Sequence, residues 1–469
     1  MEKRGNYLSK LNSSQGFEKI KEILSRDGAS VHFLGVGGIS MYSLFNFTRL
    51  MGIRVSGSDK ILSERTEKLI KNGYDVKVPE NPDGAMRASL LVYSLAVSEN
   101  DRELRIAEEL GIPEVSRAEY LGYLAELYKT RVSVSGSHGK STVTAMLTKI
   151  LSDAGLYPSS LSGARLSETA EPYVFGEKEY LVFEACEYKD SFLKFTPDIA
   201  VFLNLELDHT DYFKCFDDIS RSFLSAMKRA GRIIVNRDDA ELYALAERSG
   251  VPFLSYGIED AADIRAVNLK KGTDGYSFSV EARDFTVADI SLSVLGSFSV
   301  YNALAAFSAA YSLGISPPVI AKSLSSFHGI ERRLELLYKR KCGAPVIYDY
   351  AHHPSEIKAG ISAIKDCYSG KINVIFKPHT YTRTRDLFDE FVISLGSADR
   401  VLLSEIDAIR ENKIEGVTSG SLARSIGDNA FALSDEEILE KIKELDGALL
   451  IMGAANLEDM KEKILKEKI

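Results

Sequence analysis

Short apolar runs alternate with amphipathic stretches along most of the chain, and each such run predicts a buried strand. Near the N-terminus, Val31–Leu34 precedes a glycine-rich turn and a helical pattern over Ile39–Met51, and Arg54–Ser58 predicts a second strand ending at Asp59. Two more strands and one more helix are expected in this part: Leu90–Tyr93, Glu114–Val115 and Glu99–Leu110. This alternation predicts a parallel sheet of Rossmann type.

The pattern starts afresh at Arg131. Predicted strands lie at Val132–Ser135, Tyr180–Phe183 and Ile199–Leu203, and predicted helices at Ser141–Ala154, Asp217–Ala230 and Val300–Leu313. The weaker alternation over Val251–Val294 indicates a small antiparallel patch, Pro317-Pro318 is interpreted as a turn, and Phe327–Arg333 as a linker.

The last part repeats the alternation. Its predicted strands are Val346–Tyr348, Ile372–Phe376, Val401–Ser404 and Ala448–Met452, and its predicted helices are Pro354–Lys365, Arg383–Leu395 and Glu436–Leu445. We therefore predict an α/β protein of three domains in series, over residues 1–128, 129–330 and 331–469.

Composition supports a multidomain globular chain, because 469 residues exceed what one core usually serves. Four cysteines without a CxxC pair argue against a zinc ribbon or a disulfide framework and favour a reducing compartment, so a cytoplasmic protein is expected. The net charge of −9 disfavours a nucleic-acid surface. The sequence carries no signal peptide and no stretch typical of a membrane span.

The strongest local signal is the glycine loop GSHGKST that follows the strand Val132–Ser135. Unpaired N–H groups at the start of the next helix bind phosphate, the glycines let the backbone approach it, and Lys140 neutralises its charge. The loop is a shortened P-loop, because Val134 stands where the usual spacing has glycine. The ATP-binding residues expected here are Gly136, Ser137, His138, Gly139, Lys140, Ser141 and Thr142.

Two later segments supply partners for this loop. Glu184 follows one buried strand and Asp208-His209 follows another, so both are expected at the carboxyl edge of the sheet. A hydroxyl from Ser141, the Glu184 carboxylate and the His209 imidazole suit Mg²⁺ bound together with ATP oxygens. Cys186 and Glu187, directly beyond, are interpreted as bystanders.

The first domain carries a second glycine loop, Gly35-Val-Gly37-Gly38-Ile-Ser40, with Asp59 at the end of the following strand. It nearly matches a dinucleotide fingerprint, although Ser40 replaces the third glycine. A helix N-terminus binds the diphosphate of another nucleotide equally well, so both interpretations stay open.

Seven motifs in fixed order make the chain resemble the Mur ligases. They begin at His32, Gly136, Glu184, Asn204, Glu331, Tyr348 and Lys377: HFLGVGGISM, GSHGKST, EACEYKDSFL, NLELDHTDYF, ERRLE, YDYAHHPSE and KPHTYTRTRDLFDEF. The resemblance implies a Rossmann-like UDP-sugar domain, a P-loop ATPase-like central domain and a Rossmann-like C-terminal domain that binds the amino acid and closes on ATP. It is greatest to the member that joins L-alanine to UDP-N-acetylmuramate in peptidoglycan precursor synthesis, through an acyl phosphate.

The resemblance also implies residue roles. Lys140 would contact the β- and γ-phosphates, Ser141 and Glu184 would hold one Mg²⁺, and His209 a second. Asn302, Arg333 and Asp349 would complete the ATP site, and Arg333 and Asp349 join Lys140, Glu184 and His209 as catalytic residues. Tyr350, His352 and Arg383 would bind the alanine. The UDP-sugar residues would be Gly35, Gly37, Gly38, Ser40, Met41, Ser58, Asp59 and Ser94. A monomer or weak dimer is expected.

Some positions depart from the family pattern. Phe298 and Ser299 replace a usual His-Asn pair, Thr380 a usual arginine and Asp407 a usual tyrosine, and MGAANL replaces a more glycine-rich ending. Two alternatives therefore stay open: another Mur-type ligase step with a different amino acid or acceptor, and a non-catalytic UDP-sugar-binding relative. His32 and His328 are interpreted as structural, while His353 and His379 stay between packing support and substrate contact.

Overall fold

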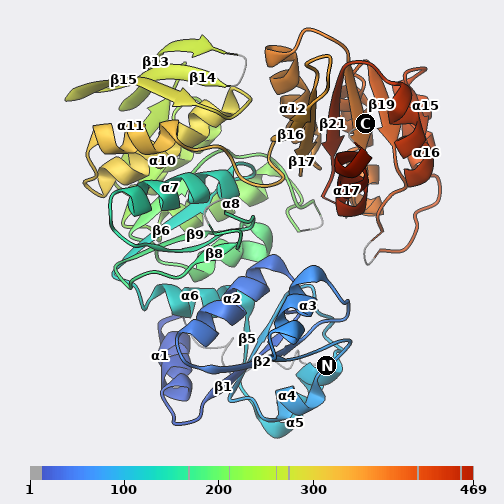
Figure 1. Cartoon of the computed structure of the whole chain (residues 1–469). Coiled ribbons are helices and arrows are strands. Elements are labelled where there is room, and N and C mark those ends of the chain that lie inside the picture. The colour runs from blue at the N-terminus through green and yellow to red at the C-terminus, as the bar shows by residue number, and fades with distance from the viewer. Residues whose placement is uncertain are drawn as a thin grey trace. The chain divides into compact units, whose positions relative to one another are not determined.

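The computed structural model describes residues 13–166, 169–210, 212–259, 261–272, 275–408, 411–454 and 457–467. The chain forms two compact units. The first comprises residues 1–255 with 308–313, and the second comprises residues 256–307 with 314–469. Figure 1 labels the helices and strands used below. Ala455 and Asn456 of the MGAANL stretch lie outside the described residues.

The N-terminal part of the first unit is a parallel sheet of five strands in the order β3-β2-β1-β4-β5. The strands are β1 Ser30–Leu34, β2 Arg54–Ser58, β3 Asp75–Lys77, β4 Leu90–Tyr93 and β5 Glu114–Ser116. The helices are α1 Ser13–Leu24, α2 Ile39–Leu50, α3 Glu64–Lys71, α4 Pro82–Met86, α5 Arg102–Leu110 and α6 Arg117–Ala125. Helix α5 begins three residues later than predicted because the Asp101 side chain accepts the Glu103 N–H and caps it.

A second sheet of the first unit contains β11-β10-β6-β9-β7-β8, parallel except for β8. Its strands are β6 Thr130–Ser135, β7 Ser159–Leu161, β8 Tyr173–Val174, β9 Tyr180–Glu184, β10 Ile199–Phe202 and β11 Arg232–Asn236. The helices are α7 Lys140–Asp153, α8 Phe216–Met227 and α9 Ala240–Ser249, with a 3₁₀ segment, η2, at Tyr188–Lys194. The strand–loop–helix order predicted around Lys140 is confirmed.

The two sheets of the first unit share one hydrophobic core. Phe47 of α2 packs edge-to-face on Phe175, with ring centroids 5.2 Å apart, and on Tyr173 of β8 at 5.9 Å. Such aromatic pairs add about 0.5–1.5 kcal/mol each beyond area burial. The boundary predicted at residue 128 divides this unit, and it stays a prediction.

The second unit opens with an antiparallel meander. Strand β13 pairs with β14, and β14 with β15, while β12 pairs with β13 through Tyr256 and Ile264. The bounds are β12 Phe253–Gly257, β13 Ile264–Lys271, β14 Tyr276–Ala282 and β15 Phe285–Leu292, followed by α10 Phe298–Ser312 and α11 Pro317–Ser325. Residues 253–255 of β12 and 308–312 of α10 are assigned to the first unit. The predicted antiparallel patch is confirmed.

The turn predicted at Pro317-Pro318 is wrong, because α11 begins there. Proline is well tolerated in the first helical turn, where its missing N–H has no partner in the helix, and Ser316 occupies the N-cap.

The remaining sheet of the second unit has the order β16-β17-β21-β18-β19-β20 and is parallel except for β16. Its strands are β16 Glu335–Lys339, β17 Pro345–Asp349, β18 Ile372–Phe376, β19 Arg400–Leu403, β20 Ala430–Ala432 and β21 Ala448–Met452. Its helices are α12 Pro354–Cys367, α13 Tyr381–Asp386, α14 Phe388–Leu395, α15 Ser419–Ile426, α16 Asp435–Lys441 and α17 Glu458–Glu467. The single helix predicted over Arg383–Leu395 is wrong, because Leu387, at φ −115° and ψ 28°, separates α13 from α14.

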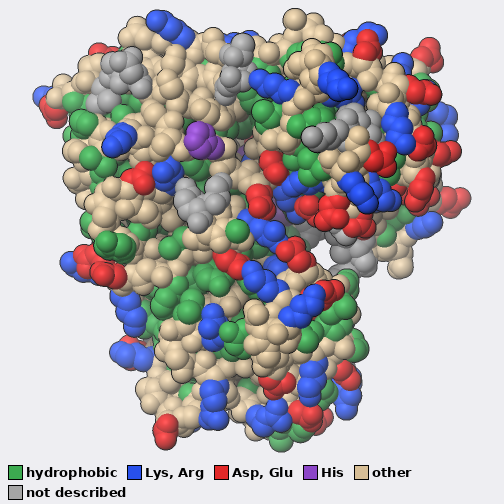
Figure 2. Space-filling view, viewed as in Figure 1, with side chains coloured by type: hydrophobic (Ala, Val, Ile, Leu, Met, Phe, Trp, Pro, Cys, Tyr) green, Lys and Arg blue, Asp and Glu red, His purple; other side chains and the backbone are tan. Residues whose placement is uncertain are grey.

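Charged side chains of both signs are interspersed over much of the face drawn in Figure 2, with apolar side chains scattered between them. Among the described residues, no helix is long and apolar enough to cross a membrane. The mixed α/β fold with parallel sheets agrees with the predicted fold class.

Candidate active site

The glycine loop between β6 and α7 lies tightly against the segment that follows β10. Gly136 and Gly139 have φ of 140° and 88°, values that favour glycine. A Cβ atom at Gly136 would lie 3.0 Å from Leu203 Cβ and 3.2 Å from Asn204 N, so a larger residue does not fit without displacing backbone. Both glycines are therefore required by geometry as well as by the predicted phosphate contact.

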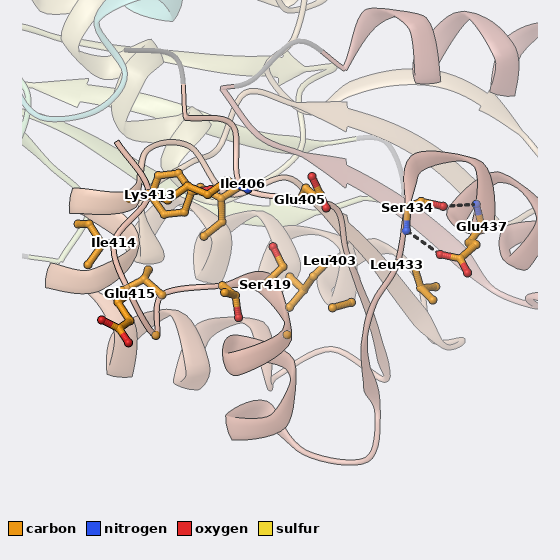
Figure 3. A pocket seen from close by; sticks show the side chains of 16 residues that line it. Leu403, Glu405, Ile406, Lys413, Ile414, Glu415, Ser419, Leu433, Ser434 and Glu437 are labelled. Atoms are coloured by element: carbon orange, nitrogen blue, oxygen red, sulfur yellow. Dashed lines mark hydrogen bonds between the residues drawn. The ribbon is translucent and has the colours of Figure 1, made fainter. Parts of the chain in front are cut away.

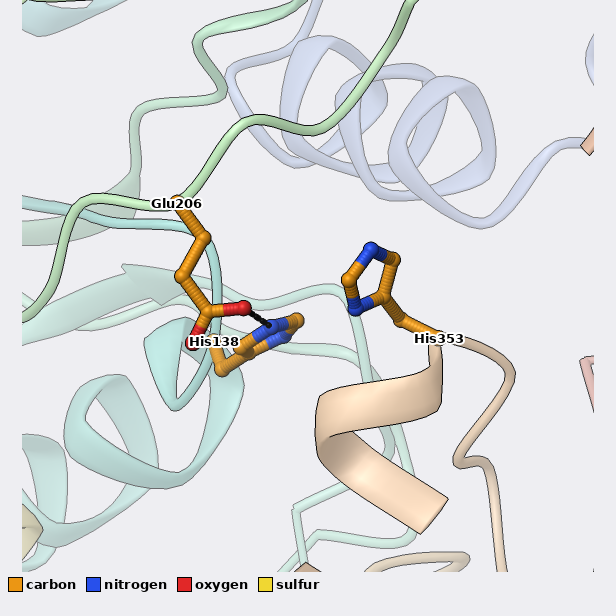
Figure 4. Close-up of side chains that lie close together, drawn as sticks. All are labelled: His138, Glu206 and His353. Atoms are coloured by element: carbon orange, nitrogen blue, oxygen red, sulfur yellow. Dashed lines mark hydrogen bonds and ion pairs between the residues drawn. The ribbon is translucent and has the colours of Figure 1, made fainter. Parts of the chain in front are cut away.

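Asn204 fixes the shape of this loop. Its side-chain oxygen accepts the His138 N–H at 2.8 Å, and its amide donates to the His138 carbonyl at 3.1 Å. The Ser137 hydroxyl accepts the Glu206 N–H at 3.0 Å. His138 Nε2 lies 3.2 Å from Glu206 Oε2, as Figure 4 shows. Residues after β10 therefore hold the predicted ATP loop in shape. The sequence motif of the loop does not by itself indicate this contribution.

Lys140, at the start of α7, lies beside a buried carboxylate. Its Nζ is 3.1 Å from Glu187 Oε2 and donates to the carbonyls of Gly136 and Ser137. Burial works against the charge of Lys140, but the charge of Glu187 outweighs it, with smaller contributions from Cys186 and Glu184, so the pKa of Lys140 lies above its usual value. Lys140 therefore stays an ammonium ion at neutral pH.

Glu187 joins Lys140 to His209. Its side chain is only 1% exposed, and its Oε1 lies 3.5 Å from His209 Nε2. Burial would raise the pKa of the Glu187 carboxyl, yet the charge of Lys140 and the hydrogen bond with His209 lower it overall. The interpretation of Glu187 as a bystander is wrong, because it is the carboxylate that contacts both predicted site residues.

His209 is held in an unusual backbone conformation, with φ of 54°. The left-handed region costs a residue other than glycine roughly 1–2 kcal/mol. The His209 N–H donates to Asp208 Oδ1 at 2.6 Å, and the Tyr188 ring packs on the imidazole with centroids 4.6 Å apart. These contacts fix the orientation of the imidazole next to Glu187.

Glu184 ends β9, as predicted, but its carboxylate accepts hydrogen bonds from the Ser162 hydroxyl, at 3.1 Å, and from the Gly163 N–H. It acts on Lys140 through its charge. Ser141 and Thr142 are buried in the first turn of α7. The predicted metal roles of Ser141, Glu184 and His209 stay predictions.

The N-terminal glycine loop has basic neighbours. Gly35, at φ 88°, donates to the Ser58 carbonyl, and the Gly37 N–H donates to Asp59 Oδ2 at 2.9 Å. Arg65 Nε donates to the Gly37 carbonyl at 2.6 Å. Farther along the loop, the Arg117 guanidinium donates to the Ser40 hydroxyl at 3.1 Å. The two arginines were not predicted, and they place positive charge beside the proposed diphosphate site.

Of the other residues predicted to bind the UDP-sugar, one lies near the N-terminal glycine loop and two are buried. Ser94 lies near the loop, because a Cβ atom on Gly35 would be 3.2 Å from Ser94 Cβ. Met41 is buried in α2. The fully buried Ser58 hydroxyl donates to Glu103 Oε2 at 2.5 Å and so belongs to the interior.

Glu103 is the centre of a buried polar network. Its Oε1 accepts the Asn81 N–H at 2.7 Å and lies 3.3 Å from His32 Nε2. Burial would raise the pKa of the Glu103 carboxyl, but His32, Ser58 and Asn81 hold it below its usual range. The structural interpretation of His32 agrees with this position.

In the second unit, Arg333 and Asp349 are neighbours of Glu356. Arg333 Nη1 lies 3.2 Å from Glu356 Oε1, and its guanidinium carbon lies 5.4 Å from the centre of the Tyr350 ring. Burial raises the pKa of Asp349 to about 7, although the charge of Arg333 works in the opposite direction. Asn302 is buried in α10.

The three residues predicted to bind the amino acid lie together through His379. The His352 ring is 5.3 Å from the Tyr350 ring and 6.3 Å from the His379 ring, and Arg383 Nη1 lies 3.4 Å from His379 Nδ1. Burial lowers the pKa of His352 to about 4. His352 is therefore neutral at pH 7. His353 caps α12 through Ser355, which supports the packing interpretation for this residue.

A cavity of about 750 Å³ lies in the second unit, at the carboxyl ends of β19 and β20. Figure 3 shows its lining, which includes Leu403, Ile406, Lys413, Ile414 and Leu433. Its described lining contains none of the predicted site residues.

Comparison with known proteins assigns the family. Three family models match successive parts of the chain: "Mur ligase family, catalytic domain" over residues 30–129, "Mur ligase middle domain" over 134–310 and "Mur ligase, glutamate ligase domain" over 332–455. A UDP-N-acetylmuramate--L-alanine ligase of Aquifex aeolicus is 39% identical over 447 residues, which cover 93% of this chain and 97% of the relative. The chain belongs to the Mur ligase family.

Other relatives of this Mur ligase match over a similar length. A UDP-N-acetylmuramate--L-alanine ligase of Clostridium novyi is 37% identical and covers 95% of this chain and 99% of its own. Among solved structures, the UDP-N-acetylmuramate-alanine ligase of Thermotoga maritima aligns with a TM-score of 0.79 at 24% identity, covering 94% of this chain and 99% of its own. A murein peptide ligase of Psychrobacter arcticus aligns with a TM-score of 0.73 at 25% identity, covering 94% and 98%. The predicted Mur ligase resemblance and fold class are confirmed.

Proposed function

We propose that this Mur ligase uses ATP to join L-alanine to the lactoyl carboxylate of UDP-N-acetylmuramate, in peptidoglycan precursor synthesis. The observation that carries the proposal is the match, over more than nine-tenths of the chain, to relatives named UDP-N-acetylmuramate--L-alanine ligase at 37–39% identity. The contacts around Lys140 support it, because they describe a lysine kept charged at a glycine loop.

The chemistry requires activation, because a carboxylate is a poor electrophile. In the first step, a carboxylate oxygen of the sugar attacks the γ-phosphorus of ATP, the bond to the bridging oxygen breaks, and ADP leaves. In the second step, the amine of alanine attacks the acyl carbon, the amine proton is lost, and inorganic phosphate leaves. Positioning and charge neutralisation control the first step.

Residues of the first unit fit this first step. Lys140 would neutralise charge on the transferred phosphoryl group, and the N–H groups at the start of α7 would contact its oxygens. Ser141 and Glu184 offer hydroxyl and carboxylate oxygens, which are the preferred ligands of Mg²⁺, and His209 is proposed as an additional nitrogen ligand. When bound, it would add further neutralisation of phosphate charge. Glu187 would keep Lys140 charged and His209 oriented.

Residues of the second unit are proposed for the amino acid and the remaining nucleotide contacts. Arg383 offers a cation for the carboxylate of alanine. A neutral His352 does not repel the incoming amine. Tyr350 borders the same cluster, and Asn302, Arg333 and Asp349 are proposed for ATP.

The decisive test is an amino-acid panel with UDP-N-acetylmuramate, ATP and Mg²⁺, followed by phosphate release and product mass. We expect phosphate release to require both the sugar nucleotide and L-alanine, with a product heavier by one alanyl residue. A clear preference for glycine, serine or an acidic amino acid would assign another ligase step. Binding of UDP-N-acetylmuramate without phosphate release for any amino acid would favour the non-catalytic alternative.

A further inference from the structure

Three metal-ligating side chains of different chemistry meet beside Lys140. One donor atom each from Cys186, Glu187 and His209 lies within 4.8 Å of the other two. Cys186 and Glu187 follow β9, and His209 follows the parallel strand β10. All three belong to the first unit. The cluster is therefore formed within one compact body.

The donor set differs from the oxygen-rich set that suits Mg²⁺. A thiolate, an imidazole and a carboxylate together are typical ligands of Zn²⁺ and of neighbouring transition metals. Three protein ligands with one open position also match the pattern in which zinc keeps a water molecule or an anion as its fourth ligand. Cys186 is what makes the set thiophilic.

The surroundings hold two of the donors in place. Glu187 is 1% exposed and already pairs with the cation of Lys140, so a negative oxygen is present at the centre of the cluster. The Tyr188 ring packs on the imidazole of His209, and the backbone N–H of His209 donates to Asp208 Oδ1. A cation entering here would need the side chains to rotate until the donor atoms, which lie within 4.8 Å of one another, all reach bonding distance.

We propose that Cys186, Glu187 and His209 bind a thiophilic divalent cation, with Zn²⁺ as the representative ion, and that the bound ion inhibits the ligase. Binding exchanges the thiol proton of Cys186 for a metal–sulfur bond, and the proton passes to solvent buffer. The ion takes Glu187 away from Lys140 and His209 away from its proposed Mg²⁺ role. The proposal that the ion binds is independent of the proposed function, whereas the proposal that it inhibits the enzyme rests on that function.

The proposed binding is tested with Co²⁺ on the full-length, nucleotide-free protein. Co²⁺ replaces Zn²⁺ at thiolate sites and gives a thiolate-to-cobalt charge-transfer absorption. We expect one Co²⁺ per chain with this absorption. Cys186→Ser should abolish the absorption and weaken Co²⁺ affinity by at least about tenfold, the lower end of the loss that follows removal of even an outer-shell partner.

The matched control is Cys215→Ser, which removes an exposed cysteine of the same unit and should retain the absorption and the affinity. His209→Asn serves as a second variant with an intact thiol, and circular dichroism verifies folding of each. His209→Asn should keep a weak thiolate signal and lose affinity. Absence of the absorption in the wild-type protein, or its persistence in Cys186→Ser, would overturn the proposal.

The proposed inhibition is tested by adding Zn²⁺ to the phosphate-release assay at fixed Mg²⁺. We expect inhibition that EDTA followed by fresh Mg²⁺ reverses, and an inhibitory Zn²⁺ concentration at least about tenfold higher for Cys186→Ser than for Cys215→Ser. Equal inhibition of the two variants would refute the inhibitory role. A protein that binds Co²⁺ through Cys186 but ligates nothing would refute the proposed function and leave the metal site standing.

Discussion

The two glycine loops of the first unit share a strand–loop–helix order. They differ in the contacts made by the buried glutamate near each loop. Each loop follows a parallel strand and starts a helix, and a buried glutamate lies close by in each case: Glu103 of α5, and Glu187 in the segment that follows β9. Glu103 is bound to Ser58, Asn81 and His32, all of them interior residues. Glu187 instead contacts Lys140 and His209, which belong to the candidate site.

Under the proposed function, this difference would distinguish a loop that binds a nucleotide from a loop at which the nucleotide also reacts. A strand–loop–helix unit supplies backbone N–H groups for a phosphate anywhere in an α/β protein. Chemistry at that phosphate further requires a cation whose charge and position are controlled, and a buried carboxylate provides that control for Lys140. The same residue type has a purely structural role when its partners face the interior.

The largest expected effect follows from removing the cation of the central loop. Lys140→Ala should lower turnover by about 10³-fold or more, the range seen when a phosphoryl-transfer cation is lost. UDP-N-acetylmuramate affinity should be nearly unchanged, because Lys140 contacts Gly136, Ser137 and Glu187, whereas the residues proposed for the sugar nucleotide belong to the N-terminal glycine loop. Steady-state kinetics and calorimetric titration measure the two quantities. A large loss of sugar-nucleotide affinity would show that sugar-nucleotide binding and ATP binding are not assigned to separate loops.

A smaller effect is expected when the lysine remains but its carboxylate partner loses its charge. Glu187→Gln should reduce turnover by about 10- to 100-fold, comparable with loss of a second-layer partner at a metal site. Sugar-nucleotide affinity should again be retained. Glu179→Gln is the matched control, because it removes an exposed partner of Lys129 at 2.8 Å in the same unit. Equal turnover of the two variants would show that the charge of Glu187 does not affect catalysis.

The structural carboxylate should affect stability and leave turnover unchanged. Glu103→Gln should destabilise the first unit by about 1–3 kcal/mol, because it leaves buried donors poorly satisfied. The thermal midpoint should fall by about 2–10 °C, while turnover per folded molecule should be retained. Glu80→Gln, which breaks the exposed pair with Arg102, is the control.

The pH dependence of the stability loss in Glu103→Gln distinguishes the contribution of the Glu103 charge from that of side-chain packing. Folding lowers the pKa of the Glu103 carboxyl below its usual value of 4.5, so the carboxylate stabilises the fold above that pH, and this stabilisation is lost as the pH falls through the folded pKa. The difference in thermal midpoint between wild type and Glu103→Gln should therefore narrow below pH 4.5. A constant difference from pH 7 to pH 3 would assign the effect to packing alone.

Much of the fold could be predicted because strands of parallel sheets are continuous apolar runs. Tyr180–Phe183 and Ile372–Phe376 are examples that the structure places within one residue of the prediction. The turn predicted at Pro317 is wrong because proline also suits the first turn of a helix, and α11 begins there with Ser316 at the N-cap position. The break at Leu387 could not be predicted from the apolar pattern, because Leu387 is itself apolar and lies between two helical segments, α13 and α14.

The candidate site was predictable in its motifs and less so in its contacts. Lys140 and His209 were singled out because glycine loops and strand ends have recognisable sequences. Glu184 and Glu187 are the same residue type three positions apart, and the chain direction after β9 decides which carboxylate reaches the lysine. Shortly after Glu187, Lys189 and Asp190 have φ of 50° and 56°, conformations that local sequence does not reveal. Arg65 was missed because its helix α3 was not predicted.

The packing of Phe47 against Tyr173 and Phe175 has a consequence for recombination between related genes. A crossover near residue 128 would join an α2 from one parent to a β8 from another, and the aromatic surfaces would no longer match. Chimeras that take residues 30–255 from a single parent would therefore retain these aromatic contacts and the shared core of the first unit.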